Sequence, residues 1–312
     1  MLKRTIAVLM GIFLTVILLG KVQSVKAADA GKGVTIVPPS FELYANPGES
    51  IADKIKVRND STSDVTYQVL VEDFKAVGEE GSVSLIDDSQ PNTTYSLAKW
   101  VVPEPRTFSL APNQEKEIPF SINVPKDAEP GGHYCSVLFQ IGGDAKIQGG
   151  GASVASRVGS LILLRVSGNV KEDASVESFT SNKNYFEKGP IGLDLRVKDN
   201  GNNHISPKGT IVITNIFGQK VAEIPLNGLN VLPSAIRKMS TEWNPKNSFL
   251  ANRYTATLVA TYGQQNKSLS ATTSFIVFPK FLIYICSAVI LLIIGLVVGR
   301  KRIRQALHNL TK

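Results

Sequence analysis

A serine and a lysine in this 312-residue chain have a spacing that could support nucleophilic chemistry. In Ser96-Leu97-Ala98-Lys99 the S-x-x-K pattern places the lysine one helical turn from the hydroxyl, where it can help to activate it. The partner signatures S-D-N and K-T-G do not occur in the sequence, and the Trp-Val-Val-Pro that follows is typical of an extended segment. We therefore expect no catalytic residue here and no enzyme activity.

Two acidic pairs could supply carboxylate oxygens to a calcium ion. They are Glu79-Glu80 and Asp87-Asp88. Neither has the D-x-D-x-D-G spacing of a compact calcium loop, so a solvated acidic loop is the better interpretation.

Histidine, cysteine and glycine patterns indicate no bound cofactor. The three histidines, at positions 133, 204 and 308, cannot be assembled by spacing into a metal site, and no Walker-type phosphate loop is present. Cys135 is expected to be a buried strand residue, and Cys286 lies in an apolar segment, so the two are not expected to pair. An exported chain without disulfides favours a bacterial surface.

The two ends of the chain have the features of membrane-targeting segments. Residues 1–30 combine Lys3 and Arg4 with an apolar run and small residues, which is the form of a signal peptide, although an uncleaved N-terminal anchor is an alternative. Phe281–Val298 is an uncharged run of eighteen residues, long enough for a transmembrane helix. The basic residues directly after it predict a cytoplasmic tail and an external body, as in a single-pass type I protein of the cell membrane.

The net charge of +8 belongs to these ends. Nine of the 34 basic residues lie in residues 1–27 and 300–312, which contain no acid, so 25 basic residues face 26 acidic ones in between. A nearly neutral body removes the support for a nucleic-acid partner.

The body of the chain is rich in strand patterns. Apolar and polar residues alternate in Ile51–Asn59, Val65–Phe74, Ile118–Val124, Ile191–Asp199 and Tyr254–Tyr262, and short Gly, Pro and Asn clusters separate such runs. Both halves also place an Asn or Asp turn after an early strand, at Asn59-Asp60-Ser61 and at Asp199-Asn200-Gly201. The predicted fold is all-β, with two tandem immunoglobulin-like β-sandwiches followed by a single transmembrane α-helix.

These patterns predict five consecutive segments. They are a signal peptide (1–30), a first sandwich (31–168), a second sandwich (169–278), a transmembrane helix (279–299) and a basic cytoplasmic tail (300–312). Two polar stretches, 76–99 and 142–156, are expected to be long loops that are either functional or disordered.

The segment from Ser96 to Gln140 carries a family resemblance. It contains P-x-x-F-x-L-x-P at 105–112 and V-P-x-x-A-x-x-G at 124–131. Here the chain resembles the peptidoglycan-binding immunoglobulin-like domain of the WxL-interacting proteins of Gram-positive surfaces and, more distantly, the first domain of periplasmic pilus chaperones. The chain itself has neither a W-x-L motif nor an LPxTG sorting signal before the apolar run, and no binding residue can be carried over from the family.

The resemblance implies a membrane-held protein that binds peptidoglycan, another cell-wall polymer or a surface protein through strand edges and loops. The distant resemblance implies an alternative, a membrane-tethered chaperone for exported proteins, in which basic residues anchor a client carboxylate between two domains. Arg58 and Arg106 are the available candidates for that role. A eukaryotic type I protein remains open, with Asn59, Asn92 and Asn266 as glycosylation acceptors.

Overall fold

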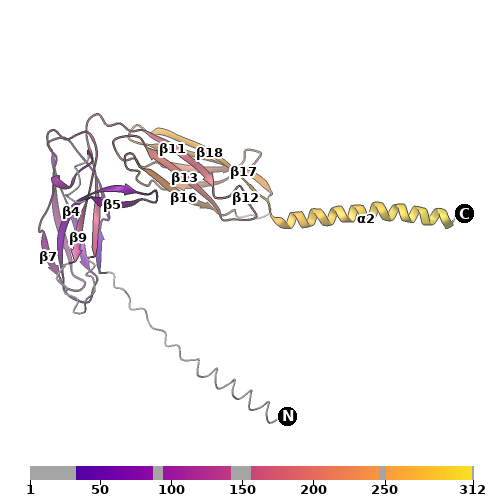
Figure 1. The fold of residues 1–312 in the computed structure, drawn as a ribbon, viewed down its shortest axis with the longest axis horizontal. Helices are drawn as coiled ribbons and strands as arrows, with labels where there is room; N and C mark the ends of the chain where they lie inside the picture. The colour runs from indigo at the N-terminus through magenta and orange to yellow at the C-terminus, as the bar shows by residue number, and fades with distance from the viewer. Residues whose placement is uncertain (1–32, 87–93, 142–155, 246–250, 311–312) are drawn as a thin grey trace, which may run out of the picture.

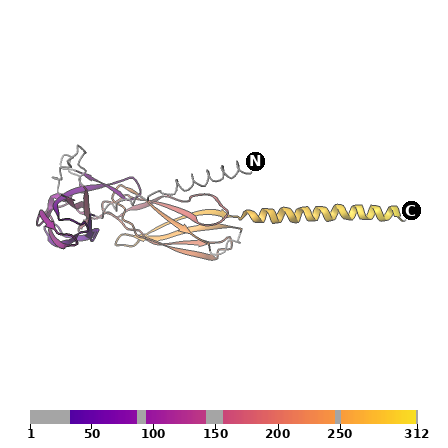
Figure 2. The same cartoon turned by 90° about the horizontal axis from the view of Figure 1, so that it is seen from below.

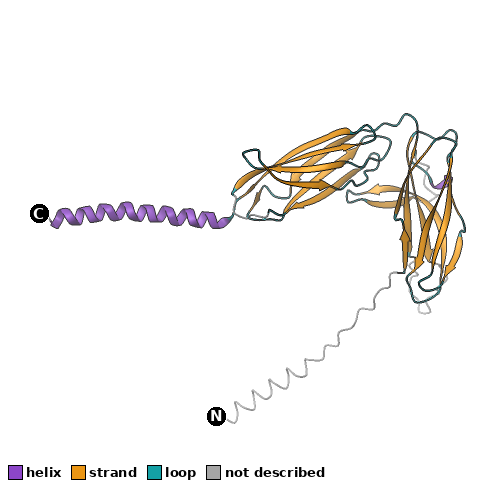
Figure 3. Cartoon of the chain, turned by 180° about the vertical axis from the view of Figure 1, so that it is seen from behind, coloured by secondary structure: helices purple, strands orange, loops and turns teal. Residues whose placement is uncertain are grey.

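The computed structural model describes residues 33–86, 94–141, 156–245 and 251–310. Two β-sandwiches lie at an angle to each other, and a long helix continues in line with the second sandwich (Figures 1 and 2). The expected signal peptide lies outside the described residues. The secondary-structure view in Figure 3 shows strands throughout both bodies, which confirms the predicted all-β fold class with one C-terminal helix.

The first sandwich consists of two sheets. One sheet has the order β1 (Val34–Val37), β3 (Ser50–Asn59), β8 (Glu115–Asn123), β6 (Val101–Pro103). The other has the order β2 (Ser40–Ala45), β10 (Arg157–Val166), β9 (Gly131–Ile141), β4 (Val65–Val77), β5 (Ser82–Ile86), with β7 (Thr107–Leu110) also paired to β4. Alternate residues of facing strands, such as Ile55, Phe120, Val137 and Leu164, form the buried core between the sheets.

The second sandwich repeats this plan in shorter form. One sheet has the order β11 (Ala174–Ser181), β13 (Ile191–Asp199), β16 (Ile236–Trp243). The other has the order β12 (Tyr185–Phe186), β18 (Lys267–Val277), β17 (Asn252–Tyr262), β14 (Lys208–Thr214), β15 (Lys220–Leu226). In β13 every second side chain is buried, as its sequence alternation predicts, and Trp243 packs edge-on against Tyr254 in the core.

One turn geometry recurs in both sandwiches. Asn59 ends β3 and Asp199 ends β13, and both side chains are fully buried. The main chain of Asn59 pairs with Asn113 and Gln114, and that of Asp199 pairs in the same way with Ser234 and Ala235. Asn113 and Ser234 both have positive φ, at 61° and 63°. The two sandwiches are therefore built on one scheme, as the parallel turn sequences indicate.

Helix α2 (Lys280–Leu310) follows β18 after a short Phe278-Pro279 connection. Its window Lys280–Val297 has a mean hydropathy of 2.6, and none of that window is buried against the rest of the described chain. Helical structure continues beyond the predicted membrane span of residues 279–299 to Leu310, because the basic segment has no helix breaker.

The prediction of a long loop over residues 76–99 is wrong in part. β4 extends to Val77 and forms a tight hairpin with β5 across the turn Gly78–Gly81. The acidic residues predicted a solvated loop, but Glu79 and Glu80 occupy only the turn of the hairpin. Leu85 of β5 packs on a buried cluster of Phe74, Tyr134 and Leu163. Asp87 and Asp88 lie outside the described residues, as does almost all of the expected 142–156 loop.

Candidate functional site

The β4–β5 hairpin crosses from the first sandwich to the second (Figures 1 and 3). At its tip, Glu79 accepts two hydrogen bonds from the Arg196 guanidinium of β13, at 2.6 and 2.5 Å. The Lys238 amide of β16 also donates to the Glu79 carbonyl at 2.7 Å. The hydrogen bond from Arg196 lowers the pKa of the Glu79 carboxyl, so the pair stays charged at neutral pH. The hairpin is therefore a strap that connects the two sandwiches.

A second interdomain contact lies at the base of β9. Asn202 accepts the Gly132 amide at 2.8 Å and donates to the Pro130 carbonyl at 3.0 Å. Gly131 has φ of +129°, and a Cβ there would come within 2.5 Å of the Asn202 carbonyl oxygen, so only glycine permits this approach. These contacts, one of the Asn202 main chain and one of its side chain, hold the second sandwich against the first at close range.

Tyr134 and His204 join the two domains next to this contact. The His204 amide donates to the Tyr134 hydroxyl at 2.8 Å, and the hydroxyl lies 3.3 Å from His204 Nδ1. Burial lowers the pKa of His204 to about 4, so the ring is neutral at pH 7 and its Nδ1 can accept from the hydroxyl. Tyr134 and His204 therefore form a hydrogen-bonded pair between the two domains.

An ion pair closes the other side of the junction. Arg165 near the end of β10 donates to Glu172 at 2.5 Å, and the two side chains are only 14% and 6% exposed. Glu172 also accepts the Gln264 amide at 2.9 Å, and its carbonyl accepts from Lys267 at 2.6 Å. Because both side chains are largely buried, removal of one partner would leave a buried charge unpaired.

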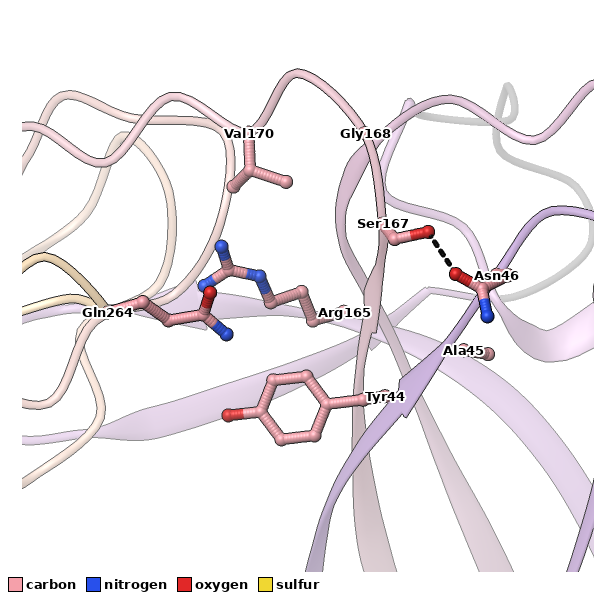
Figure 4. Close-up of a pocket in the computed structure, with 8 residues that line it drawn as sticks. All are labelled: Tyr44, Ala45, Asn46, Arg165, Ser167, Gly168, Val170 and Gln264. Atoms are coloured by element: carbon pink, nitrogen blue, oxygen red, sulfur yellow. Dashed lines mark hydrogen bonds between the residues drawn. The ribbon is translucent and has the colours of Figure 1, made fainter.

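A cleft opens between the sandwiches beside this ion pair. Two adjoining cavities, of about 300 and 260 Å³, share Tyr44, Arg165 and Gln264. Figure 4 shows Tyr44 and Gln264 directed toward each other from opposite walls, with Arg165 between them and a hydrogen bond from Ser167 to Asn46 at the rim. Tyr44 is 61% exposed although its ring lies in a concave region. The cleft is open, polar and large enough for several side chains of a ligand.

Strand β2 borders this cleft along its unpaired edge. In the parallel pair of β2 with β10, the Pro39 carbonyl accepts from Leu161 and the Ala45 carbonyl accepts from Ser167, so the odd-numbered residues bond inward. The amides and carbonyls of Glu42 and Tyr44 therefore point outward. Within the described residues no other strand pairs with that edge. Glu42 and Tyr44 both line the cleft, so the unpaired edge of β2 lies beside it.

The S-x-x-K residues form a structural unit on the first sandwich. Ser96 donates to the Asp73 carboxylate, which also accepts the Leu97 and Ala98 amides at 2.9 and 2.7 Å. Asp73 thus caps the short 3₁₀ helix η1 (Ala98–Trp100), and the extended segment that the sequence indicates follows directly as β6 (Val101–Pro103). The Ser96 hydroxyl is thus bound to the same carboxylate that accepts the first amides of η1.

His133 lies beside this unit but does not face the serine hydroxyl. Its Nδ1 lies 3.1 Å from the Ser96 carbonyl, its Nε2 lies 2.9 Å from the Glu129 carbonyl, and its ring packs on Trp100 at 4.5 Å. Both ring nitrogens are therefore engaged by main-chain oxygens. Among the described residues, no group of three metal-ligating side chains comes together.

The two arginines that the chaperone alternative singled out do not lie in the cleft. Arg58 pairs with Asp60 at 2.6 Å, eight residues along β3 from the end that faces the cleft, or about 26 Å. The Arg106 carbonyl accepts the Val69 amide, and Val69 lies opposite Phe139 in the distant half of β9. Sequence reasoning missed Arg165, because a lone arginine in an apolar strand carries no motif.

The remaining predicted residues have plain structural roles. Cys135 is confirmed as a buried strand residue, and burial raises its thiol pKa well above the ordinary value. Asn59 donates to the Ser63 and Leu110 carbonyls from a fully buried amide, which excludes it as a glycan acceptor in the folded chain. Asn266 is exposed in the β17–β18 turn, and Asn92 lies outside the described residues.

No family model matches the sequence, and no curated protein matches it significantly. Solved structures similar to the chain include the class 5 fimbriae chaperone CfaA, with 16% identity over 78% of this chain and 98% of that one, at a TM-score of 0.39. The E. coli chaperone DraB has 11% identity over 78% of this chain and 94% of its own, at 0.35. The periplasmic chaperone SfaE has 12% identity over 78% and 100%, at 0.33. Function therefore has to be inferred from the cleft itself.

Proposed function

We propose that this chain is a membrane-anchored cell-surface protein that binds an extended segment of a protein partner in the interdomain cleft. The observation that carries the proposal is the unpaired outer edge of β2 at Glu42 and Tyr44, two residues that also line a cavity of about 260 Å³. An extended peptide can add to such an edge by main-chain hydrogen bonds, while side-chain pockets select its sequence. We propose a binding protein and not an enzyme.

The membrane part of the proposal rests on α2. The window Lys280–Val297 is long and apolar enough to cross a hydrocarbon core of about 30 Å. Arg300, Lys301 and Arg302 directly follow the apolar run, and such an excess of positive charge marks the cytoplasmic side. Both sandwiches would then lie outside the cell, as expected for a single-pass type I protein.

A protein ligand fits this cleft better than a cell-wall polymer. The glycan strands of a cell-wall polymer present hydroxyl and acetamido groups, without the regular alternation of amide donors and carbonyl acceptors that pairs with a strand edge. The cleft adds carboxylate, phenol and guanidinium groups at Glu42, Tyr44 and Arg165, which can contact side chains of an added strand. Peptidoglycan binding, which the family resemblance implied, would not depend on main-chain pairing at β2.

The second candidate is a membrane-tethered assembly factor for exported proteins. The contacts of Glu79 with Arg196 and of Asn202 with Gly132 favour it, because a fixed angle between the sandwiches gives a client a preformed docking surface. Binding chemistry would be the same in both candidates. The fate of the partner in the absence of this chain distinguishes them.

The proposal is tested by removing one outward amide from β2. Tyr44→Pro deletes an N–H on the unpaired edge of β2 and leaves the inward bonds to β10 intact, whereas Tyr44→Ala keeps the N–H and is the matched control. A photo-crosslinking amino acid at Gln264, on the opposite wall, reports occupancy in whole cells. We expect a discrete protein adduct that survives Tyr44→Ala in part and is lost in Tyr44→Pro.

Equal adducts in the two variants would show that the β2 edge is not used. If the adduct appears and the partner is degraded in cells lacking this chain, the assembly-factor function holds. If the partner is stable without it, the chain is a surface binder.

A further inference from the structure

The β14–β15 turn presents two large apolar side chains to solvent. Ile216 is 62% exposed and Phe217 is 77% exposed, which makes Phe217 the most exposed large hydrophobic side chain among the described residues. Most isolated surface hydrophobics need no explanation. Two adjacent ones at the tip of a turn, where glycine, asparagine or serine is the usual choice, do need one.

The turn is held rigid by its own hydrogen bonds. Asn215 Oδ1 accepts the Phe217 and Gln219 amides at 3.0 Å each, and the Asn215 amide group donates to Gln219 Oε1 at 2.9 Å. Gly218 supplies the positive φ of 76° that the turn requires, and its amide donates to the Asn215 carbonyl. These bonds fix the backbone of the turn, on which both apolar side chains are exposed to solvent.

Strand register places this turn at the end of the second sandwich from which α2 leaves. Thr214 pairs with Thr255, which in turn pairs with Ser274, three residues before β18 ends at Val277. Ile216 and Phe217 lie two and three residues beyond Thr214, so they reach the level of Val277. Figures 1 and 2 both show α2 continuing in line with the long axis of this sandwich.

The same end of the sandwich has the composition of a membrane-facing surface. Tyr185, 42% exposed, donates its hydroxyl to the Phe278 carbonyl at 2.5 Å, directly before the helix. Lys183, Lys188 and Arg253 are exposed at this end, and Lys280 at the start of α2 pairs with Glu187. Aromatic rings at headgroup depth with basic residues around them are typical of proteins seated on anionic bilayers.

We infer that the Ile216-Phe217 turn inserts into the headgroup layer of the bilayer that α2 crosses, and so forms a second membrane contact of the external body. This inference rests on the proposed membrane anchoring. The occupant is lipid because the turn ends at the level where the apolar span begins, and the polar layer of a bilayer extends several ångströms outward from that level. A single helix attaches the second sandwich to the bilayer at one point only. A helix and a turn on a different strand pair attach it at two points and so fix its tilt relative to the bilayer.

The test measures immersion depth in the full chain. A nitroxide label is placed at Ile216→Cys in a Cys286→Ser background, since Cys135 is buried and stays unlabelled. The protein is reconstituted in nanodiscs of phosphatidylcholine and phosphatidylglycerol, and label accessibility to oxygen and to a water-soluble nickel chelate is measured. Val259→Cys is the matched control, because Val259 is 57% exposed on the same sheet, about 20 Å farther from the helix.

We expect accessibility of the 216 label to the nickel chelate to be about threefold lower than that of the 259 label, and to rise about threefold when Phe217→Ser is added. A label at Leu291→Cys in α2 distinguishes failure of the turn contact from failure of the membrane anchor. If the 291 label is buried in lipid while the 216 and 259 labels are equally accessible, the turn contact is refuted and the anchor stands. If the 291 label is accessible to the nickel chelate, both fail.

Discussion

Replacement of Asp199 by asparagine should stabilise the second sandwich in a pH-dependent way. Asp199 is fully buried at the end of β13, where its Oδ1 accepts the Gly201 amide at 2.8 Å and its Oδ2 has no hydrogen-bond partner. Asn59 occupies the equivalent place in the first sandwich, and its amide group donates to two carbonyls. A protonated carboxyl or an asparagine can donate at this position, and an ionised carboxylate cannot.

The magnitude follows from the pKa of Asp199. Burial raises this pKa from 3.8 to about 7, and the nearby acids Asp173 and Glu172 add to the shift. Because the folded state binds the proton more tightly, the free energy of unfolding falls as the pH rises from about 4 to 7 and is constant above that range. A difference of about three pKa units corresponds to an upper value of about 4 kcal/mol at pH 8. Asp199→Asn removes this pH-dependent loss.

The assay is urea unfolding of the full chain in detergent at pH 5 and pH 8. Trp243 emission reports the second sandwich once Trp100→Phe silences the first. We expect Asp199→Asn to raise the free energy of unfolding at pH 8 by about 2 to 4 kcal/mol and by less at pH 5. The reciprocal variant Asn59→Asp should destabilise the first sandwich, more at pH 8 than at pH 5. A gain from Asp199→Asn that is equal at both pH values would refute the assigned titration.

Three further changes test the other contacts. Asp73→Ala removes the acceptor for the Ser96 hydroxyl and two amides, and we expect a loss of about 2 kcal/mol in the free energy of unfolding of the first sandwich, measured by Trp100 emission. Glu79→Gln removes the charged partner of Arg196, so the distribution of distances between spin labels on the two sandwiches should broaden. The unmodified chain should show a similar broadening at roughly 1 M salt, where the Debye length is ~3 Å. An unchanged distribution in Glu79→Gln would show that the strap does not set the angle between the sandwiches. Gly131→Ala should broaden the same distribution without salt dependence, because its Cβ would meet a main-chain oxygen, and a sharp distribution in that variant would contradict the close packing.

The strands could be predicted from the sequence because their signal is local. Alternation over Ile191–Asp199 coincides with β13, and Val65–Phe74 differs from β4 only by three residues at its C-terminal end. The apolar run of α2 is equally local. Such patterns depend on neighbours two or four residues away, so each segment carries its own information.

The interdomain site could not be predicted because its contacts join distant residues. Glu79 meets Arg196 across 117 positions, and Asn230 meets Glu42 across 188, so no spacing rule relates them. Glu79 also has the features of a solvated turn acid in sequence, and only the pairing of β4 with β5 carries it to the second sandwich. A usable signal did exist at β2, where Glu42 and Tyr44 alternate with apolar residues next to the Asn46-Pro47-Gly48 turn.

The cleft and the Ile216-Phe217 turn depend on each other through the junction between the two sandwiches. The cleft is bordered by β2 of the first sandwich and by the Gly263–Asn266 turn of the second, so its width changes whenever the angle between the sandwiches changes. The Glu79 strap, the Asn202 contact and the Arg165–Glu172 pair lie at separate places around this junction and restrict rotation about more than one axis. If the Phe217 turn fixes the second sandwich on the bilayer, the same contacts hold the first sandwich and the β2 edge at a constant height and direction above the membrane. Loss of the strap would therefore weaken partner binding even though Glu79 does not line the cleft, whereas loss of Phe217 would leave the cleft intact and change only its orientation.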